Sequence, residues 1–141
     1  MNEYEQFQEL LDDNEIFYKS DTLSSGTPLF RIPQKIKNGG FADMLVIFNE
    51  DNIKLVIAKI ATVDDPEKRV KFYELFNEMN DTYRYFKLYV DSDGDIMLEG
   101  DLTMDLRDGD FQPETLMAYI GASLKLLENA YPKIMKLMWA D

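Results

Sequence analysis

Residues 41–60, FADMLVIFNEDNIKLVIAKI, decide the fold, because two β-type runs flank the turn-forming stretch 49–52. We expect an antiparallel hairpin here. Its register makes one face wholly apolar, with Phe48 opposite Ile53, Val46 opposite Leu55 and Met44 opposite Ile57. The other face is half polar, with Ile47 opposite Lys54, Leu45 opposite Val56 and Asp43 opposite Ala58. A helix or another subunit should cover that second face in part.

A second hairpin is predicted where the runs 82–90 and 95–102 flank the turn 91–94. A three-residue loop with Gly94 in the left-handed conformation sets its register. The apolar face then pairs Val90 with Ile96, Leu88 with Leu98 and Phe86 with Gly100. The opposite face pairs Tyr89 with Met97, Lys87 with Glu99 and Tyr85 with Asp101, which includes one opposite-charge pair.

Two further strand-like runs precede the first hairpin, at residues 15–22 and 27–36, and the turn 24–26 separates them. The second run contains two prolines. Because proline cannot donate to a β-ladder, Pro28 and Pro33 suit strand ends or edge positions better than a central strand.

The first two helices are predicted from their start signals. Asn2 and Glu5 have the spacing of a capping box, and the helix that follows should end near residues 12–14. A second helix should begin at Asp65-Pro66-Glu67, since proline fits the first helical position, and should run to about Asn80.

The last helix is predicted to span residues 112–139. Phe111 and Leu116 flank its start at the spacing of a hydrophobic staple. Its apolar stripe should consist of Leu116, Ile120, Leu124, Leu127, Tyr131 and Met135. Pro132 lies inside it and should bend it.

The order of these elements is helix, about four strands, helix, two strands and a long helix. It predicts an α+β domain in which an antiparallel sheet packs with three helices. The length of 141 residues and the 45% hydrophobic content fit one domain that spans residues 1–141.

The composition excludes several kinds of chemistry, because the chain has no cysteine and no histidine. Zinc sites of the usual Cys/His kind, cysteine nucleophiles and histidine general bases are ruled out. Chemistry by carboxylates, Lys, Tyr and Ser, or by oxygen-ligated Mg²⁺ and Ca²⁺, stays open. Together with the charge and the resemblance described below, the composition leads us to predict no enzyme activity, no cofactor and no metal site.

The net charge of −12 limits the partners. Such a surface repels phosphate backbones, so neither nucleic acid nor an anionic membrane is an expected partner. The start, MNEYEQFQELLDDNE, lacks the basic and apolar regions of a signal peptide, and no apolar run approaches a membrane span. We expect a cytoplasmic location.

The carboxylates of the second hairpin suggest the main functional alternative to a purely structural interpretation of this segment. Asp91, Asp93 and Asp95 suggest a cation site, but an EF-hand loop with Gly94 at its sixth position would place Tyr89 at the first ligand position. An ordinary acidic turn is therefore favoured. Glu99 and Asp101 alternate as a solvated strand face does.

Two asparagines lie one helical turn apart near the end of the second helix. Asn77 and Asn80 can cap that helix end or bind a neighbouring backbone.

The last helix carries more apolar side chains than one face needs. Methionine adapts to varied partners and tryptophan is a frequent interface anchor. The alternative is that the same residues form the core face of the helix. The candidate protein-binding surface consists of Met117, Ile120, Leu124, Tyr131, Met135, Met138 and Trp139.

Residues 69–102, RVKFYELFNEMNDTYRYFKLYVDSDGDIMLEGDL, and the segment FQPETLMAYI at 111–120 resemble the YbjN-like family of bacterial sensory-transduction regulators. The matching features are the stretch 77–80, the strand 86–90, the Asp93-Gly94-Asp95 turn and the Pro113-Glu114 helix start. The resemblance implies a fold similar to that of type III secretion chaperones. It also implies a bacterial, non-enzymatic protein that binds or regulates other proteins, with a homodimer as one option.

Two hypotheses of function follow. The first is a chaperone-like binding or regulatory module that uses an apolar sheet face or the last helix within an acidic rim. The second is a divalent-cation-dependent sensor or enzyme that uses the carboxylates of the hairpin, Asp91, Asp93, Asp95, Glu99 and Asp101.

Overall fold

The computed structural model describes residues 1–37, 40–103 and 111–140 and contains the predicted antiparallel sheet. Its strands lie in the order β1-β2-β3-β4-β6-β5, so the two predicted hairpins are neighbours in one sheet. The strands are β1 (Lys19–Thr22), β2 (Pro28–Lys35), β3 (Phe41–Phe48), β4 (Asn52–Ala58), β5 (Lys87–Val90) and β6 (Ile96–Thr103).

The register of the first hairpin is confirmed along its whole length. Phe48 lies opposite Ile53, and the remaining pairs of both faces follow as the alternation predicts. The buried side chains of the apolar face are Met44, Val46, Phe48, Ile53, Leu55 and Ile57.

The second hairpin is confirmed in register but is shorter than predicted. Pairing runs from Lys87 opposite Glu99 to Val90 opposite Ile96, and Gly94 has a φ of +87°. The predicted start at residue 82 is wrong, because helix α2 continues to Thr82 and residues 83–86 form a connection instead of a strand.

The two prolines of β2 lie where a strand tolerates them. Pro28 is the first residue of the strand. Pro33 pairs with Asp43 of β3 but lies beyond β1, whose pairing with β2 stops at Arg31. At Pro33 the strand is therefore an edge on one side, as the sequence predicts.

Local capping signals set the helix starts. In α1 (Glu3–Asp13) the Asn2 side chain accepts from the Glu5 amide at 2.8 Å, which completes the predicted capping box. Asp65 caps α2 (Pro66–Thr82), and α3 spans Pro113–Met138 with Pro132 inside it.

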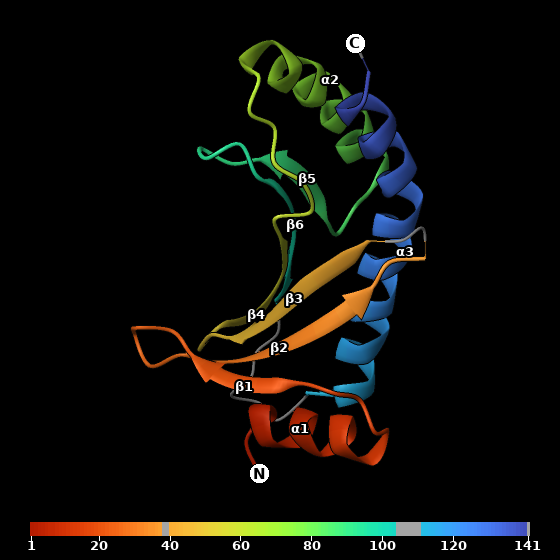
Figure 1. Cartoon of the computed structure of the whole chain (residues 1–141). Helices are drawn as coiled ribbons and strands as arrows, with labels where there is room; N and C mark the ends of the chain where they lie inside the picture. The colour runs from red at the N-terminus through yellow and green to blue at the C-terminus, as the bar shows by residue number, and fades with distance from the viewer. Residues whose placement is uncertain (38–39, 104–110, 141) are drawn as a thin grey trace.

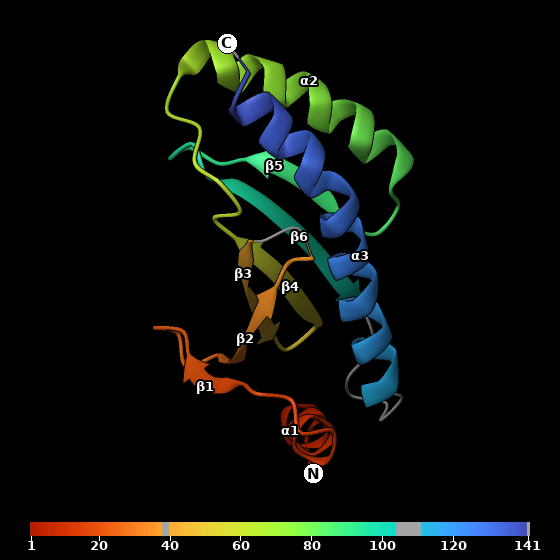
Figure 2. The same ribbon diagram turned by 45° about the vertical axis from the view of Figure 1, so that its right-hand side comes forward.

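All three helices lie on one side of the sheet (Figures 1 and 2). Helix α3 runs along the sheet from α1 to α2, and it contacts both helices. Lys68 of α2 donates its Nζ to the carbonyl oxygens of Met138 and Ala140, at 2.7 and 2.9 Å, and so caps the end of α3. The core lies between these helices and one face of the sheet.

The core stripe of α3 differs from the predicted one. Its buried residues are Leu116, Ile120, Ser123, Leu126, Leu127, Ala130 and Ile134. Leu124, Tyr131 and Met135 lie on its flank and are half-buried. The prediction passed over two small residues, because Ser123 and Ala130 carry little hydrophobic signal. Ser123 is accommodated in the core since its hydroxyl donates to the Ile120 carbonyl at 2.6 Å.

Candidate functional site

The sheet face opposite the helices is the main candidate site, and we call it the open face. None of the helices in the described ranges covers it, so the cover by a helix that the sequence suggested is not found there (Figure 1). The side chains alternate along each strand, which places on this face Lys19, Asp21, Leu29, Arg31, Pro33, Lys35, Phe41, Asp43, Leu45, Ile47, Lys54, Val56, Ala58, Lys87, Tyr89, Met97, Glu99 and Asp101.

The centre of the open face is apolar. Leu29 lies opposite Ile47, and Leu45 lies opposite Val56, so four aliphatic side chains from three adjacent strands meet there. Leu29 is 1% exposed and Val56 is 8% exposed, although neither belongs to the main core cluster. Leu45 and Ile47 are half-buried. The sheet thus has a small apolar cluster on the side away from its core.

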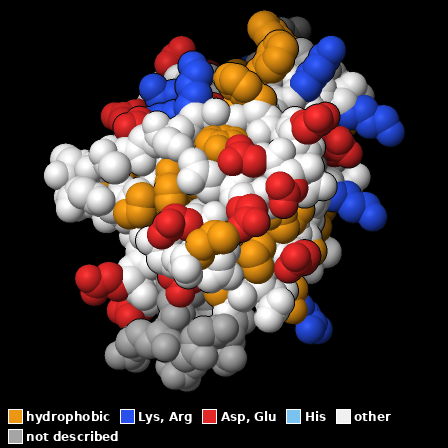
Figure 3. Space-filling model, turned by 90° about the horizontal axis from the view of Figure 1, so that it is seen from below, with side chains coloured by type: hydrophobic (Ala, Val, Ile, Leu, Met, Phe, Trp, Pro, Cys, Tyr) orange, Lys and Arg blue, Asp and Glu red, His pale blue; other side chains and the backbone are white. Residues whose placement is uncertain are grey.

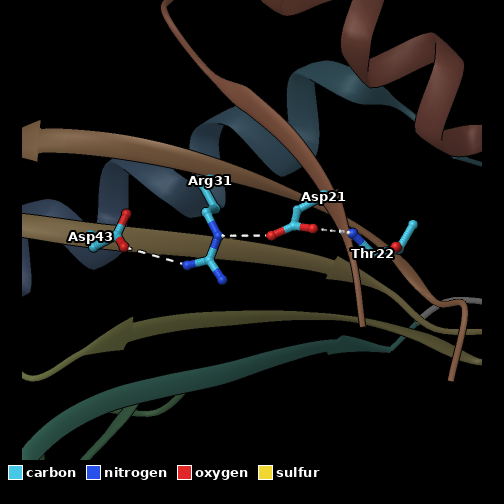
Figure 4. A network of polar contacts seen from close by, with 4 residues as sticks. All are labelled: Asp21, Thr22, Arg31 and Asp43. Atoms are coloured by element: carbon cyan, nitrogen blue, oxygen red, sulfur yellow. Dashed lines mark hydrogen bonds and ion pairs between the residues drawn. The ribbon is translucent and has the colours of Figure 1, made fainter. Parts of the chain in front are cut away.

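An arginine network borders this apolar centre on the β1 side. Figure 4 shows Arg31 reaching from β2 between two carboxylates, with the α3 ribbon behind the strands. Its Nε lies 3.2 Å from Asp21 and its Nη1 lies 3.5 Å from Asp43. Asp21 also accepts from the Thr22 amide at 2.8 Å. The hydrogen bond from this amide, together with Arg31, lowers the pKa of Asp21.

A second polar network borders the centre on the β6 side. The Glu99 carboxylate lies 2.7 Å from Lys54 Nζ and accepts from the Tyr89 hydroxyl at 2.6 Å. Burial alone would raise the pKa of Glu99, but the hydrogen bonds from Lys54 and Tyr89 outweigh it and lower that pKa. Burial and the bond to Glu99 raise the pKa of Tyr89 to about 12. Next to them, Asp101 accepts from Asn52 at 2.7 Å.

The open face is almost neutral, in contrast with the whole chain. It carries five basic residues and four acidic ones: Lys19, Arg31, Lys35, Lys54 and Lys87 against Asp21, Asp43, Glu99 and Asp101. The chain as a whole has 15 basic and 27 acidic residues, so the acidic excess lies elsewhere. The side seen from below carries many Asp and Glu side chains among apolar ones (Figure 3).

The surface predicted on the last helix is mostly packed against the core. Ile120 is 4% exposed and belongs to the core, so it is not available at a surface. Five others are half-buried against the core: Met117, Leu124, Tyr131, Met135 and Met138. A Cβ added at Gly40 would lie 2.7 Å from the Tyr131 hydroxyl, which shows how closely this flank meets the loop before β3. Trp139 is 81% exposed.

The acidic turn has the structure of a stabilised loop. Asp91, Asp93 and Asp95 are the one group of at least three acidic side chains, within the described residues, close enough to hold a metal ion. However, Asp91 Oδ1 accepts from the amides of Asp93 and Asp95, both at 2.9 Å. Asp95 accepts from the Thr62 hydroxyl at 2.6 Å. These bonds support the interpretation as an acidic turn.

The turn is also close to a positive charge. A Cβ added at Gly94 would lie 2.6 Å from the Val63 carbonyl oxygen and would also collide with the Arg69 guanidinium. Arg69 donates to that same carbonyl at 2.7 Å. Glu99 and Asp101 have partners of their own on the open face, so the structure does not join all five carboxylates of the hairpin into one site.

Asn80 binds a neighbouring backbone, which was one of its two predicted roles. Its Nδ2 donates to the Leu88 carbonyl at 2.9 Å, and its Oδ1 accepts from the Leu88 amide at 2.8 Å. These are the two bonds that a further strand would make with β5. The side chain therefore closes the β5 edge of the sheet. Asn77 lies beside it, along a shallow hollow between α2 and β5.

A family model matches most of this chain. The model of the YbjN family, described as "Putative bacterial sensory transduction regulator", matches residues 4–135. The chain belongs to the YbjN family. The match includes all six strands and α2 of this YbjN-family chain and most of α1 and α3, so it extends to the first half of the chain. A search of curated proteins finds no match.

No helix within the described residues combines the length and hydropathy that a membrane span requires. Sequence reasoning placed Leu45, Val56 and Lys54 on the half-polar face of the hairpin but missed Leu29 and Arg31 of β2. The alternation of Leu29, Arg31 and Pro33 with buried residues was the signal that could have found them.

Proposed function

We propose that this YbjN-family chain is a non-enzymatic, cytoplasmic regulatory module that acts by binding another protein through the open face. The observation that carries the proposal is an apolar centre on a nearly neutral sheet face in a chain of net charge −12. An antiparallel sheet needs only one packed face, so the fold itself does not require Leu45 and Ile47 on the other.

The two polar networks around the centre suit a protein partner. Arg31, Lys54 and their carboxylates are already paired, so a partner can cover them without isolating an unpaired charge. The acidic excess outside this face favours approach of a partner with a basic rim. A second copy of the chain is also compatible, because the almost neutral open face does not repel itself.

Membership of a family of sensory-transduction regulators supports the regulatory part of the proposal. Binding like that of type III secretion chaperones stays a prediction. The surface of the last helix stays a second candidate, with Trp139 as its most exposed residue.

Site-specific photo-crosslinking in bacterial cells tests the proposal. The crosslinking residue p-benzoylphenylalanine replaces one exposed aromatic residue at a time: Phe41 on the open face, Trp139 at the end of α3, and Tyr73 on α2 as the control. Phe41 is 78% exposed, so the replacement should not disturb the fold.

We expect a defined product from position 41 and none from position 73. A product of twice the chain mass identifies a homodimer, and any other mass identifies a different protein. A defined product only from position 139 would show that the binding site lies on α3 instead. Absence of any product from position 41 would contradict the proposal.

A further inference from the structure

A shallow hollow lies between α3 and the connection 83–86 that joins α2 to β5. Its volume is about 320 Å³, which is at the lower end of the range for small-molecule sites. Its apolar lining includes Phe86 and Leu126, both buried, together with Ala122, Tyr83 and the exposed ring of Tyr85. The hollow therefore offers an apolar surface for about one or two rings of a ligand.

The charge along this hollow differs from that of the chain as a whole. Arg84 and Lys125 line it, and its described lining includes no Asp or Glu. Within the part of the chain that the structure describes, neither Arg84 nor Lys125 forms an ion pair. A second hollow shares the same connection and also Arg84, but it is lined by Glu99 and Asp101 as well as by Lys87. Only the first hollow has basic residues without acidic ones in its described lining.

Tyr119 of α3 holds the connection in place. Its hydroxyl lies 3.1 Å from the Tyr85 carbonyl oxygen and 3.3 Å from that of Asp101. The ring of Tyr119 packs on Phe86 with 4.5 Å between centroids. Gly100 leaves room for both rings, because a Cβ there would lie 2.5 Å from the Tyr119 hydroxyl and 2.6 Å from Phe86. These contacts fix the apolar residues before any ligand arrives, which lowers the cost of binding.

We propose that this hollow binds a small organic anion with an aromatic body. The body packs against Phe86, Leu126 and Tyr85, and the anionic group pairs with Arg84 and Lys125. The site lies on residues other than those of the open face. It would give a regulator a small-molecule input separate from its protein partner.

The test uses 1-anilinonaphthalene-8-sulfonate as the probe, an aromatic anion whose fluorescence rises in apolar surroundings. N-phenyl-1-naphthylamine has the same aromatic body without the sulfonate and is the matched control ligand. We expect saturable binding of one equivalent of the sulfonate to the folded chain. The amine should bind at least about tenfold more weakly, because it lacks the contact with the two cations.

Two variants locate the binding. R84Q combined with K125Q should weaken sulfonate binding about tenfold. The control, K71Q combined with K133Q, removes the same charge from exposed positions outside the hollow and should leave binding unchanged. A122W adds bulk at an exposed position of the hollow and should block both probes without a change of charge.

The thermal unfolding midpoint of each variant shows whether it is folded. If R84Q/K125Q does not fold, A122W decides the location by itself. The proposal is overturned if the sulfonate shows no saturable binding, if both probes bind equally, or if R84Q/K125Q binds as the control does. Unchanged binding in A122W would overturn it as well.

Discussion

The two faces of the sheet are built from the same strands and yet differ in what holds them. On the packed face, Met44, Val46, Leu55 and Ile57 are fully buried under the helices. On the open face, the intervening residues form a small apolar centre between two polar networks. The packed face already supplies the core, so the core does not need the apolar residues of the open face. We propose that the two half-buried ones, Leu45 and Ile47, contact a partner.

The difference between the two faces is tested most strongly by truncating one leucine on each face and comparing the losses of stability. L55A removes a side chain that is fully buried under the helices. It should lower the free energy of unfolding by about 2–5 kcal/mol. L45A makes the same change on the open face, where the side chain is half-buried, and should cost about 1 kcal/mol. Urea denaturation of both variants measures the difference. Equal losses would show that both faces are core.

The Asn80 side chain closes the β5 edge of the sheet. Removing its bonds to Leu88 should have the next largest effect on stability. N80L removes both bonds to the Leu88 backbone. Since a partly buried donor and acceptor then lose their partner, we expect a loss of about 1–3 kcal/mol in unfolding free energy. The freed edge should also promote aggregation, which light scattering detects. N77L, one turn away on the same helix, is the control and should change neither property.

The polar network around Glu99 should make the open face sensitive to pH at both ends of the scale. The pKa of Tyr89 is raised to about 12, so its contribution to stability is present below pH 10 and is lost as the pH rises toward 12. The pKa of Glu99 is lowered, so its contribution is lost as the pH falls below the ordinary value of 4.5.

The variant Y89F tests the alkaline part of this prediction. Unfolding free energies measured between pH 8 and about 12 should fall less in Y89F than in the unmodified chain, by an amount on the order of 1 kcal/mol. Identical profiles would show that the hydrogen bond between Tyr89 and Glu99 does not contribute to stability.

Removing the arginine network should have a smaller effect on stability. Arg31 and both of its carboxylates are substantially exposed, so R31M should cost about 0–1 kcal/mol. The pKa of Asp21 is lowered partly by Arg31, and should rise toward its ordinary value in the variant. An NMR titration of the Asp21 carboxyl carbon measures this change. A pKa that stays the same would assign the whole shift to the Thr22 amide.

The smallest effect is expected at the acidic turn, which lies beyond the end of both faces, when a divalent cation is added. Asp91 and Asp95 already accept bonds within the turn, and Arg69 lies against Gly94. We therefore expect calorimetric titration with Ca²⁺ or Mg²⁺ to show no binding tighter than that of a generic acidic surface. A saturable site lost in D93N would instead support the cation-dependent hypothesis.

Sequence patterns predicted the elements and registers because these depend on local signals. The alternation around Phe48 and Ile53, the capping residues Asn2 and Asp65, and Gly94 were sufficient to place them. The α3 stripe was misplaced, because Ser123 and Ala130 carry little hydrophobic signal although both are buried. Strand order brings Arg31 of β2 next to Leu45 of β3, and no spacing within one strand encodes that contact.

Site residues were harder to predict than the fold for the same reason. The apolar centre of the open face and the cation-lined hollow both join side chains from separate elements. Phe86 and Leu126 are 40 positions apart in the chain and meet only because α3 crosses the connection before β5. The pairing of Asn80 with Leu88 was within reach, since a backbone partner was one of its two predicted roles.

Capture of a partner by variants of the open face tests the central claim most directly. The tagged chain is purified from bacterial cells and examined by native mass spectrometry. It is compared with L45S/I47S, on the open face, and with V70S/Y73S, which changes two exposed apolar residues of α2. We predict that the unmodified chain and V70S/Y73S retain a protein partner or a second copy, whereas folded L45S/I47S loses it. Retention of the same partner by L45S/I47S, or its absence from all three proteins, would contradict the account.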